Sequence, residues 1–150
     1  MRLEHVEDME TQAVVKAMVE AEGLVSSDLD EDDVELMVLR DGISVVACGG
    51  LEIMGPDVLL RSLVVRDGWR GRGIGVMLLA AMEAAAKQRG VATAWLLTTG
   101  PVDYFRRRGY EVVDRQNVVA TIAGSRQFKS LCPASAFCMR KALTETTNKE

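Results

Sequence analysis

Cysteine and histidine are scarce in this sequence, and so are the sites that these residues build. The chain has three cysteines and a single histidine, His5, and it contains no Cys-x-x-Cys pair. A zinc site or other metal site is therefore not predicted, and neither is a disulfide framework. We expect Cys48, Cys132 and Cys138 to be mostly buried free thiols. Cys132 has an alternative as a reactive thiol, since it lies in the loop-like stretch SLCPAS.

Long apolar runs and prolines are also lacking. No apolar run approaches the roughly 18 residues of a membrane-spanning helix. The charged N-terminus, MRLEHVEDME, lacks the apolar segment of a secretory signal. These absences predict a cytoplasmic protein with no membrane partner. With 150 residues, 48% of them hydrophobic, and only three prolines, the sequence predicts one folded domain over residues 1–150, with a frayed tail from about residue 144.

Aromatic residues are few, and the charges are unevenly distributed. Residues 1–60 contain three Lys/Arg and fifteen Asp/Glu, a balance of −12, whereas residues 61–150 contain fifteen and seven, a balance of +8; the sum is the net charge of −4. A basic second half suits a polyanionic ligand, although the two halves could instead complement each other within the fold. Two Trp, two Tyr and three Phe offer few stacking platforms, which argues against nucleic acid as a partner.

The stretch from Val58 to Gly90 has the most informative pattern. Aliphatic and β-branched residues from Val58 to Val65 predict a strand that Asp67-Gly68 ends. Apolar residues at three-and-four spacing from Ile74 onward predict a long amphipathic helix that ends at Arg89-Gly90. Between them, the loop RGRGIG places glycines and two arginines at a helix N-terminus, which is a favourable place for an anion. The alternative is a glycine-rich turn that only caps the helix.

Other segments complete an α+β pattern. The sequence predicts an N-terminal helix, an acidic connector, an antiparallel hairpin whose second strand contains Gly49-Gly50 as a bulge or close backbone approach, and further strands around a short helix. The acidic connector either attracts a cationic amine or is a solvated loop, and the loop is the favoured interpretation. The expected elements are a possible strand at 3–6, the helix 9–22, the connector 24–33, the strands 34–39, 43–53, 91–98 and 109–113, the short helix 102–108, an ambiguous segment 117–129 and a last strand within 133–143.

The glycine loop resembles a known signature. It is neither a P-loop, because no Lys-Ser or Lys-Thr follows, nor the dinucleotide fingerprint Gly-x-Gly-x-x-Gly. Arg70-x-x-Gly73-x-Gly75, between a strand and a helix, resembles the pyrophosphate-binding signature Arg/Gln-x-x-Gly-x-Gly/Ala of the GCN5-related N-acetyltransferases (GNATs). Phe105, Gly109 and Tyr110 resemble the second signature of that family, aromatic-x-x-x-Gly-aromatic. The resemblance covers about residues 9–143 and implies the GNAT fold, a mixed, mostly antiparallel central sheet flanked by helices.

The resemblance also implies a cosubstrate, acetyl-CoA, and the residues that hold it. Leu63, Val64 and Val65 would present backbone groups to pantetheine, with an N–H near Val64 or Val65 as the oxyanion donor. The pyrophosphate would lie on the glycine-rich loop, and the resemblance also implies that Phe105 contacts the cosubstrate. The loop residues so implied are Arg70, Gly71, Arg72, Gly73, Ile74 and Gly75.

The acid and base are less well marked. Many relatives carry tyrosine at the position of Phe105, whereas here Tyr104 lies one residue earlier, about 100° around the helix. Tyr104 is a candidate general acid, with packing as its other interpretation and transfer by positioning alone as the alternative mechanism. Glu52, the acidic residue within the central strands, is the candidate general base; the alternative is a surface-facing strand residue.

Arg61 indicates the acceptor. An arginine inside the apolar strand LLRSLVV is costly unless it is paired or faces a polar cleft, so it is either a clamp for an acceptor carboxylate or part of a structural ion pair. Arg126 and Lys129, near the C-terminal hairpin, are candidates to add to such a clamp. Together with LLRSLVV, the segment FRRRGY and the C-terminal stretch FKSLCPASAFCMRKAL resemble short bacterial acetyltransferases associated with arsenic resistance and, more distantly, amino-acid N-acetyltransferases. That resemblance implies direct acetylation of a small amino-acid-like acceptor that bears a carboxylate. Alternatives are a protein N-terminal or lysine acetyltransferase and a non-catalytic CoA-binding sensor; a homodimer is common among relatives.

Overall fold

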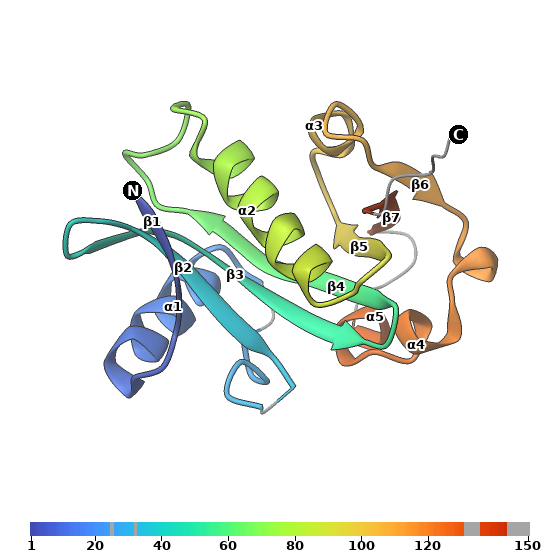
Figure 1. Cartoon of the computed structure of the whole chain (residues 1–150), viewed down its shortest axis with the longest axis horizontal. Coiled ribbons are helices and arrows are strands. Elements are labelled where there is room, and N and C mark those ends of the chain that lie inside the picture. Colours follow the sequence, from blue (N-terminus) through green and yellow to red (C-terminus); the bar gives the residue numbers. More distant parts are fainter. Residues whose placement is uncertain (25, 32, 131–135, 144–150) are drawn as a thin grey trace. The chain divides into compact units, whose positions relative to one another are not determined.

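The computed structural model describes residues 1–24, 26–31, 33–130 and 136–143, with only the backbone of Ser130. Its elements are β1 (Arg2–His5), α1 (Met9–Ala21), β2 (Glu35–Asp41), β3 (Ser44–Met54), β4 (Asp57–Val65), α2 (Ile74–Gln88), β5 (Thr93–Thr98), α3 (Val102–Arg106), β6 (Glu111–Val113), the 3-10 turn η1 (Arg115–Asn117), α4 (Ala120–Ala123), α5 (Arg126–Ser130) and β7 (Phe137–Ala142). The strands form a seven-stranded, mostly antiparallel sheet in the order β1-β2-β3-β4-β5-β7-β6, flanked by helices (Figure 1). The predicted fold class is confirmed.

The chain divides into two compact units. The first comprises Met1–Glu52 and Leu60–Ala86, and the second comprises Ile53–Leu59 and the chain from Lys87 onward. The expected tail from about residue 144 and the expected thiol of Cys132 lie outside the described residues. No helix in the described part of the chain is long and apolar enough to span a bilayer.

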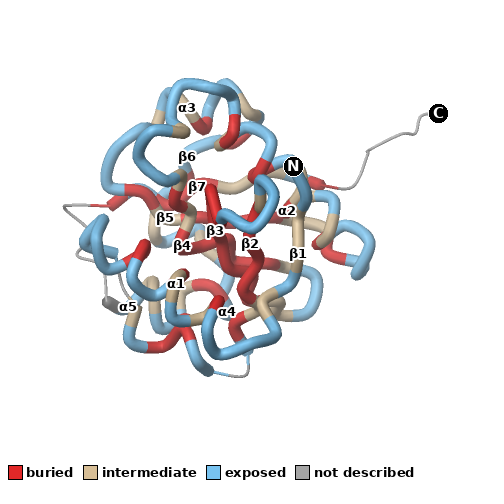
Figure 2. The backbone as a smooth tube through the Cα atoms, turned by 90° about the vertical axis from the view of Figure 1, so that its left-hand side faces the viewer, coloured by how far each residue is buried: buried red, intermediate tan, exposed pale blue. Residues whose placement is uncertain are grey.

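In the first unit, α1 and α2 cover opposite faces of the strands. Val15 and Val19 of α1 pack with Leu36 and Val38 of β2 in one apolar cluster. On the other face, a Cβ at Gly49 would lie only 2.5 Å from the Sδ of Met82 in α2. Figure 1 shows the two helices on either side of β2 and β3, and Figure 2 shows both strands largely buried.

The Gly49-Gly50 pair therefore marks a close approach and not a bulge. The β2–β3 register runs without interruption through Met37↔Gly49 and Leu36↔Gly50, and it shifts instead between Leu39 and Arg40. Gly42 (φ +62°) makes the predicted tight turn of this hairpin.

In the second unit, β7 pairs antiparallel with both β5 and β6. Leu59, Trp95, Ile122 and Cys138 form its apolar cluster. The indole N–H of the buried Trp95 donates to the Asp57 carboxylate at 2.8 Å. The ambiguous segment 117–129 contains α4 and most of α5.

Candidate functional site

The candidate site is built on β4, the glycine-rich loop that follows it and the start of α2. Gly68, Gly71 and Gly73 have φ of +88°, +79° and +78°, left-handed conformations that favour glycine. A Cβ at Gly71 or Gly73 would meet no atom within 4 Å, so backbone conformation alone requires glycine there and the space over the loop is open. The loop lies at the N-terminus of α2, where the first N–H groups lack intrahelical partners and the helix dipole is positive. This arrangement fits an anionic ligand.

The side chains of the two loop arginines, Arg70 and Arg72, make contacts with other residues of the chain. Arg70 donates from Nε to the Val65 carbonyl at 2.9 Å and from Nη2 to the Glu22 carboxylate at 2.9 Å. The guanidinium of Arg72 lies 4.9 Å from the ring centroid of Trp69. These contacts join the loop to the end of β4 and to the end of α1, so the strand and loop residues predicted to bind the cosubstrate lie together.

Ser62 interrupts the alternation of β4. Its φ of +58° makes it the one non-glycine residue with a positive φ in the described chain. Arg61 and Val64, three positions apart, both lie on the face of the sheet that α1 covers: Arg61 Cγ is near Gly50, and Val64 packs in the apolar cluster with Val15 and Val19 of α1. Leu63 lies near Gly49 on the opposite face, which α2 covers. In an uninterrupted strand, residues two apart lie on the same face. The irregular backbone at Ser62 therefore adds one residue between Arg61 and Val64 and shifts the alternation of the side chains. Left-handed backbone costs about 1–3 kcal/mol, and such strain concentrates at functional sites.

Arg61 is paired with two carboxylates. Its Nη1 and Nη2 donate to Asp28 Oδ2 and Oδ1 at 2.5 and 2.6 Å, and Nη1 also donates to Glu52 Oε1 at 2.7 Å. The side chain of Arg61 is 0% exposed, that of Asp28 10% and that of Glu52 4%. Burial alone would lower the pKa of Arg61, but the bonds to Asp28 and Glu52 outweigh it and the pKa is raised.

These contacts bring Arg61 and Glu52 together and add Asp28, which the sequence reasoning missed. The acidic connector is not only a solvated loop, since Asp28 is buried in the ion pair and Leu29 is buried in the core. Glu52 does not face the surface either, because it is 3% exposed. The contacts describe a structural ion pair, and a clamp role for Arg61 would require an acceptor to enter it.

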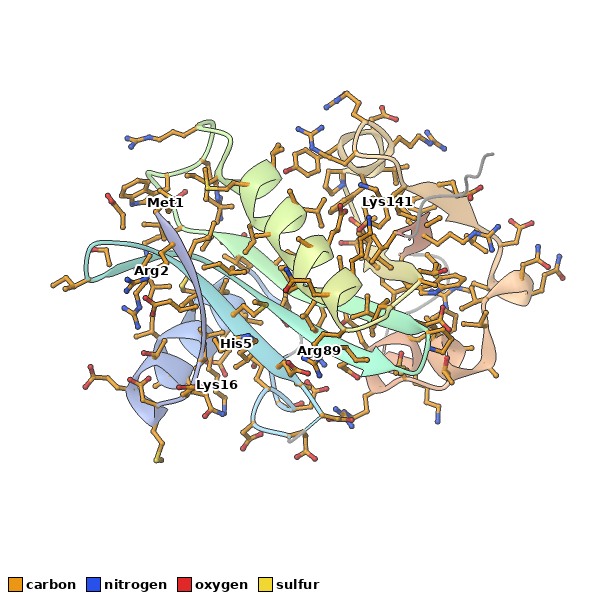
Figure 3. All side chains as sticks on the ribbon, in the orientation of Figure 1. Met1, Arg2, His5, Lys16, Arg89 and Lys141 are labelled. Atoms are coloured by element: carbon orange, nitrogen blue, oxygen red, sulfur yellow. The ribbon has the colours of Figure 1, made fainter. Side chains whose placement is uncertain are left out.

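The other candidate residues lie in the second unit. The Arg108 guanidinium is 4.1 Å from the Tyr104 ring centroid, and the Tyr104 and Phe105 rings meet edge to face at 5.2 Å. Phe105 also packs edge to face on Tyr110 at 6.0 Å, and Lys141, labelled in Figure 3, lies 5.7 Å from the Tyr110 ring. Arg126 is exposed on α5. The catalytic, cofactor and acceptor roles assigned to Tyr104, Phe105 and Arg126 stay predictions.

The thiols and acids offer little further chemistry. Burial raises the pKa of Cys48 to about 12 and that of Cys138 to about 11, so both are free, unreactive thiols at neutral pH. Among the described residues, no group of three or more His, Cys, Asp or Glu side chains could hold a metal ion.

The sequence also matches a known family. Residues 32–112, more than half of the chain, match the family described as "Acetyltransferase (GNAT) domain". The chain belongs to the GNAT acetyltransferase family. It is therefore an N-acetyltransferase domain of the kind that uses acetyl-CoA, and the open glycine loop at the start of α2 fits that cosubstrate.

Relatives of this GNAT domain include enzymes that act on amino acids. It is 26% identical over 121 residues to an amino-acid acetyltransferase of Pasteurella multocida (strain Pm70), a match that covers 76% of the chain and 27% of that protein. The chain thus spans about a quarter of the length of this curated relative.

Two solved structures share the fold of the domain. One is N-acetylglutamate synthase from Neisseria gonorrhoeae complexed with coenzyme A and N-acetyl-glutamate (TM-score 0.77, 17% identity, covering 96% of this chain and 35% of that chain). The other is Rv2747 from Mycobacterium tuberculosis in complex with CoA and NLQ (TM-score 0.75, 16% identity, covering 96% and 100%).

Proposed function

We propose that this GNAT domain transfers the acetyl group of acetyl-CoA directly to the amine of a small, amino-acid-like acceptor that bears a carboxylate. The observation that carries the cosubstrate is the loop of left-handed glycines, open to solvent, at the N-terminus of α2. Support for the acceptor class comes from the match to an amino-acid acetyltransferase over 76% of the chain. Coenzyme A and N-acetyl-glutamate in the gonococcal synthase agree with both parts of the proposal.

The reaction makes one bond and breaks one bond. The lone pair of the acceptor nitrogen attacks the thioester carbonyl carbon, the C–S bond breaks with its electron pair on sulfur, and the proton that nitrogen loses ends on the thiol or in solvent. Catalysis needs a deprotonated amine, a stabilised oxyanion and a protonated leaving group. We propose that a backbone N–H near Val64 or Val65, at the end of β4, donates a hydrogen bond to the oxyanion that forms on the thioester carbonyl.

The acid and base are part of the proposal. Glu52 is our candidate base; its hydrogen bond with Arg61 holds the carboxylate in one orientation. Tyr104, a half-buried residue of α3, is our candidate acid. The cofactor role of Phe105 and the acceptor role of Arg126 belong to the proposal in the same way.

The chemical type of the acceptor, the location in the cell and the oligomeric state are also proposals. The likeness to arsenic-resistance acetyltransferases suggests that the acceptor resembles glutamate. A cytoplasmic location is the second of these proposals. A homodimer is the third proposal, because dimers are common among relatives, and sedimentation at two protein concentrations tests it.

Coenzyme A binding is tested by thermal unfolding. Coenzyme A should raise the melting temperature of the wild type, and Gly73→Glu should abolish the shift because it places a carboxylate where the pyrophosphate belongs. Gly42→Glu is the matched control, since Gly42 also has a positive φ and open space around its Cβ position but lies in the β2–β3 turn. A shift that survives in Gly73→Glu would contradict the loop assignment.

The acceptor is tested by thiol release from acetyl-CoA. The panel should contain amino acids, glutamate analogues, polyamines and peptides. Turnover of carboxylate-bearing small amines supports the proposal. Turnover confined to peptides would replace it with a protein acetyltransferase, and the absence of thiol release with every amine would favour a CoA-binding sensor.

A further inference from the structure

We propose that Asp28 occupies the position of the acceptor carboxylate on Arg61, and that the acceptor binds by replacing it. The inference rests on the proposed function, because it needs an acceptor with a carboxylate. It adds a specificity-determining residue on the connector between α1 and β2.

The two carboxylates bind Arg61 in different ways. Asp28 accepts with both of its oxygens from the two terminal nitrogens, at 2.5 and 2.6 Å, whereas Glu52 Oε1 accepts from Nη1 at 2.7 Å. The side-by-side pattern of Asp28 is the one by which arginine recognises a free carboxylate. Asp28 therefore holds the fork that an acceptor carboxylate would need.

The backbone around each carboxylate decides which one can leave. Glu52 lies in β3 and its side chain is 4% exposed. Asp28 lies in a turn, where Glu31 N–H donates to its carbonyl at 3.1 Å, and its side chain is 10% exposed. A change of the Asp28 side-chain rotamer would release its carboxylate from Arg61 and leave this backbone bond in place. Glu52 would keep its bond to Arg61 throughout.

The fixed parts of the cluster stay in place during such an exchange. Arg61 Nε donates to the Ser62 hydroxyl at 3.2 Å, and Arg61 Cγ lies 3.3 Å from the position of a Cβ on Gly50. The guanidinium is thus held by β4 and β3 while one carboxylate replaces another. The exchange never leaves a buried cation uncompensated, which would be strongly destabilising.

Selectivity follows from competition for the guanidinium. When the acceptor amine bears a carboxylate, that carboxylate replaces the two charge-assisted hydrogen bonds between Asp28 and Arg61 with an equivalent pair. An amine without a carboxylate offers no such group, so Asp28 stays on Arg61. Weakening the Asp28 bonds should then favour carboxylate-bearing acceptors.

The first experiment compares the wild type with Asp28→Asn. Asn offers one neutral oxygen in place of two charged ones, and the weaker competitor should lower KM for carboxylate-bearing amines about fivefold relative to amines without a carboxylate. Asp30→Asn, an exposed position on the same connector, is the matched control and should leave the KM ratio unchanged. An equal or raised ratio in Asp28→Asn overturns the inference while the proposed function stands. Absence of turnover with every carboxylate-bearing amine overturns both.

The second experiment is independent of activity. Asp28→Ala removes the internal carboxylate, so sodium acetate should raise its melting temperature more than an equal concentration of sodium chloride does. The wild type, in which Asp28 fills the site, should respond equally to both salts, and so should Asp28→Ala combined with Arg61→Met. If Asp28→Ala is unfolded in buffer, acetate should restore its folding. A variant that acetate neither stabilises nor refolds contradicts a replaceable carboxylate on Arg61.

Discussion

At the scale of single residues, Asp8 makes a contact whose strength depends on pH. Asp8 is the N-cap of α1, and its carboxylate accepts a hydrogen bond from Thr11 N–H at 2.9 Å. Hydrogen bonds from the Thr11 side chain and amide lower the pKa of Asp8 in the folded protein. A lowered folded pKa means that the ionised cap stabilises the protein above the unfolded pKa of about 3.9, and that this stabilisation is lost as the pH falls through the folded value.

Asp8→Ala should therefore unfold at a lower temperature than the wild type at pH 7, and the gap should close as the pH falls below about 4. Asp8→Asn is the control, because it keeps a capping oxygen that does not ionise, so its melting temperature should lie between the other two at pH 7. Melting curves measured from pH 7 down to pH 2 check this. A gap between wild type and Asp8→Ala that is the same at every pH would show that ionisation of Asp8 contributes nothing.

Single residues also show where reasoning from the sequence ends. The cost of burying a guanidinium singled out Arg61 from the run LLRSLVV, and its burial is observed. The partner was not identifiable, since Asp28 is one acid among several in an acidic connector and lies 33 positions away. Only the folded chain brings Leu29 into the core and so places its neighbour Asp28 on Arg61.

At the scale of elements, the packing of α2 on β3 depends on one glycine. A Cβ at Gly49 would lie 2.5 Å from Met82 Sδ and 3.0 Å from Leu63 Cδ2, and Met82 is fully buried. Gly49→Ala should therefore reduce the free energy of unfolding by about 1–3 kcal/mol, since an extra methyl overpacks the contact. Gly100→Ala, where a Cβ would meet nothing within 4 Å and φ is not positive, should have little effect.

Urea unfolding of Gly49→Ala, Met82→Ala and the double variant identifies the clash. Met82→Ala alone should cost about 2–5 kcal/mol through the space that it leaves. The methyl that Gly49→Ala adds fills part of that space, so the double variant should lose less than the sum of the single losses. Strictly additive losses would mean that Met82 is not what the methyl meets.

Elements also differ in how far the sequence predicts them. The strand, loop and helix from β4 through α2 depend on local patterns, namely aliphatic runs, left-handed glycines and three-and-four spacing, and all three are where the sequence predicts them. The phase of β4 was not predictable, because a serine in the left-handed conformation at Ser62 has no sequence signal and moves Val64 onto the face of Arg61. The interpretation of Gly49-Gly50 as a close approach needed the position of Met82, which is distant in sequence.

At the scale of the whole molecule, three elements cross the boundary between the two units. β3 crosses it at Glu52/Ile53, β4 at Leu59/Leu60 and α2 at Ala86/Lys87. A strand cannot lose its pairing on one side of such a point without fraying the ladder on the other, and a helix behaves in the same cooperative way. We therefore expect residues 1–150 to unfold as the single domain that the sequence predicts.

Hydrogen exchange with and without coenzyme A tests this expectation. The glycine loop belongs to the first unit, and a ligand at 100 times its Kd stabilises whatever unfolds with its site by about 2.7 kcal/mol. If the chain unfolds as one domain, the slowest amides of the β6–β7 pair in the second unit should gain the same protection as those of the β2–β3 pair. In Gly73→Glu, which should not bind coenzyme A, neither pair should gain protection. Protection confined to β2–β3 in the wild type would mean that the second unit unfolds by itself, because a ligand can stabilise only the cooperative unit that contains its site.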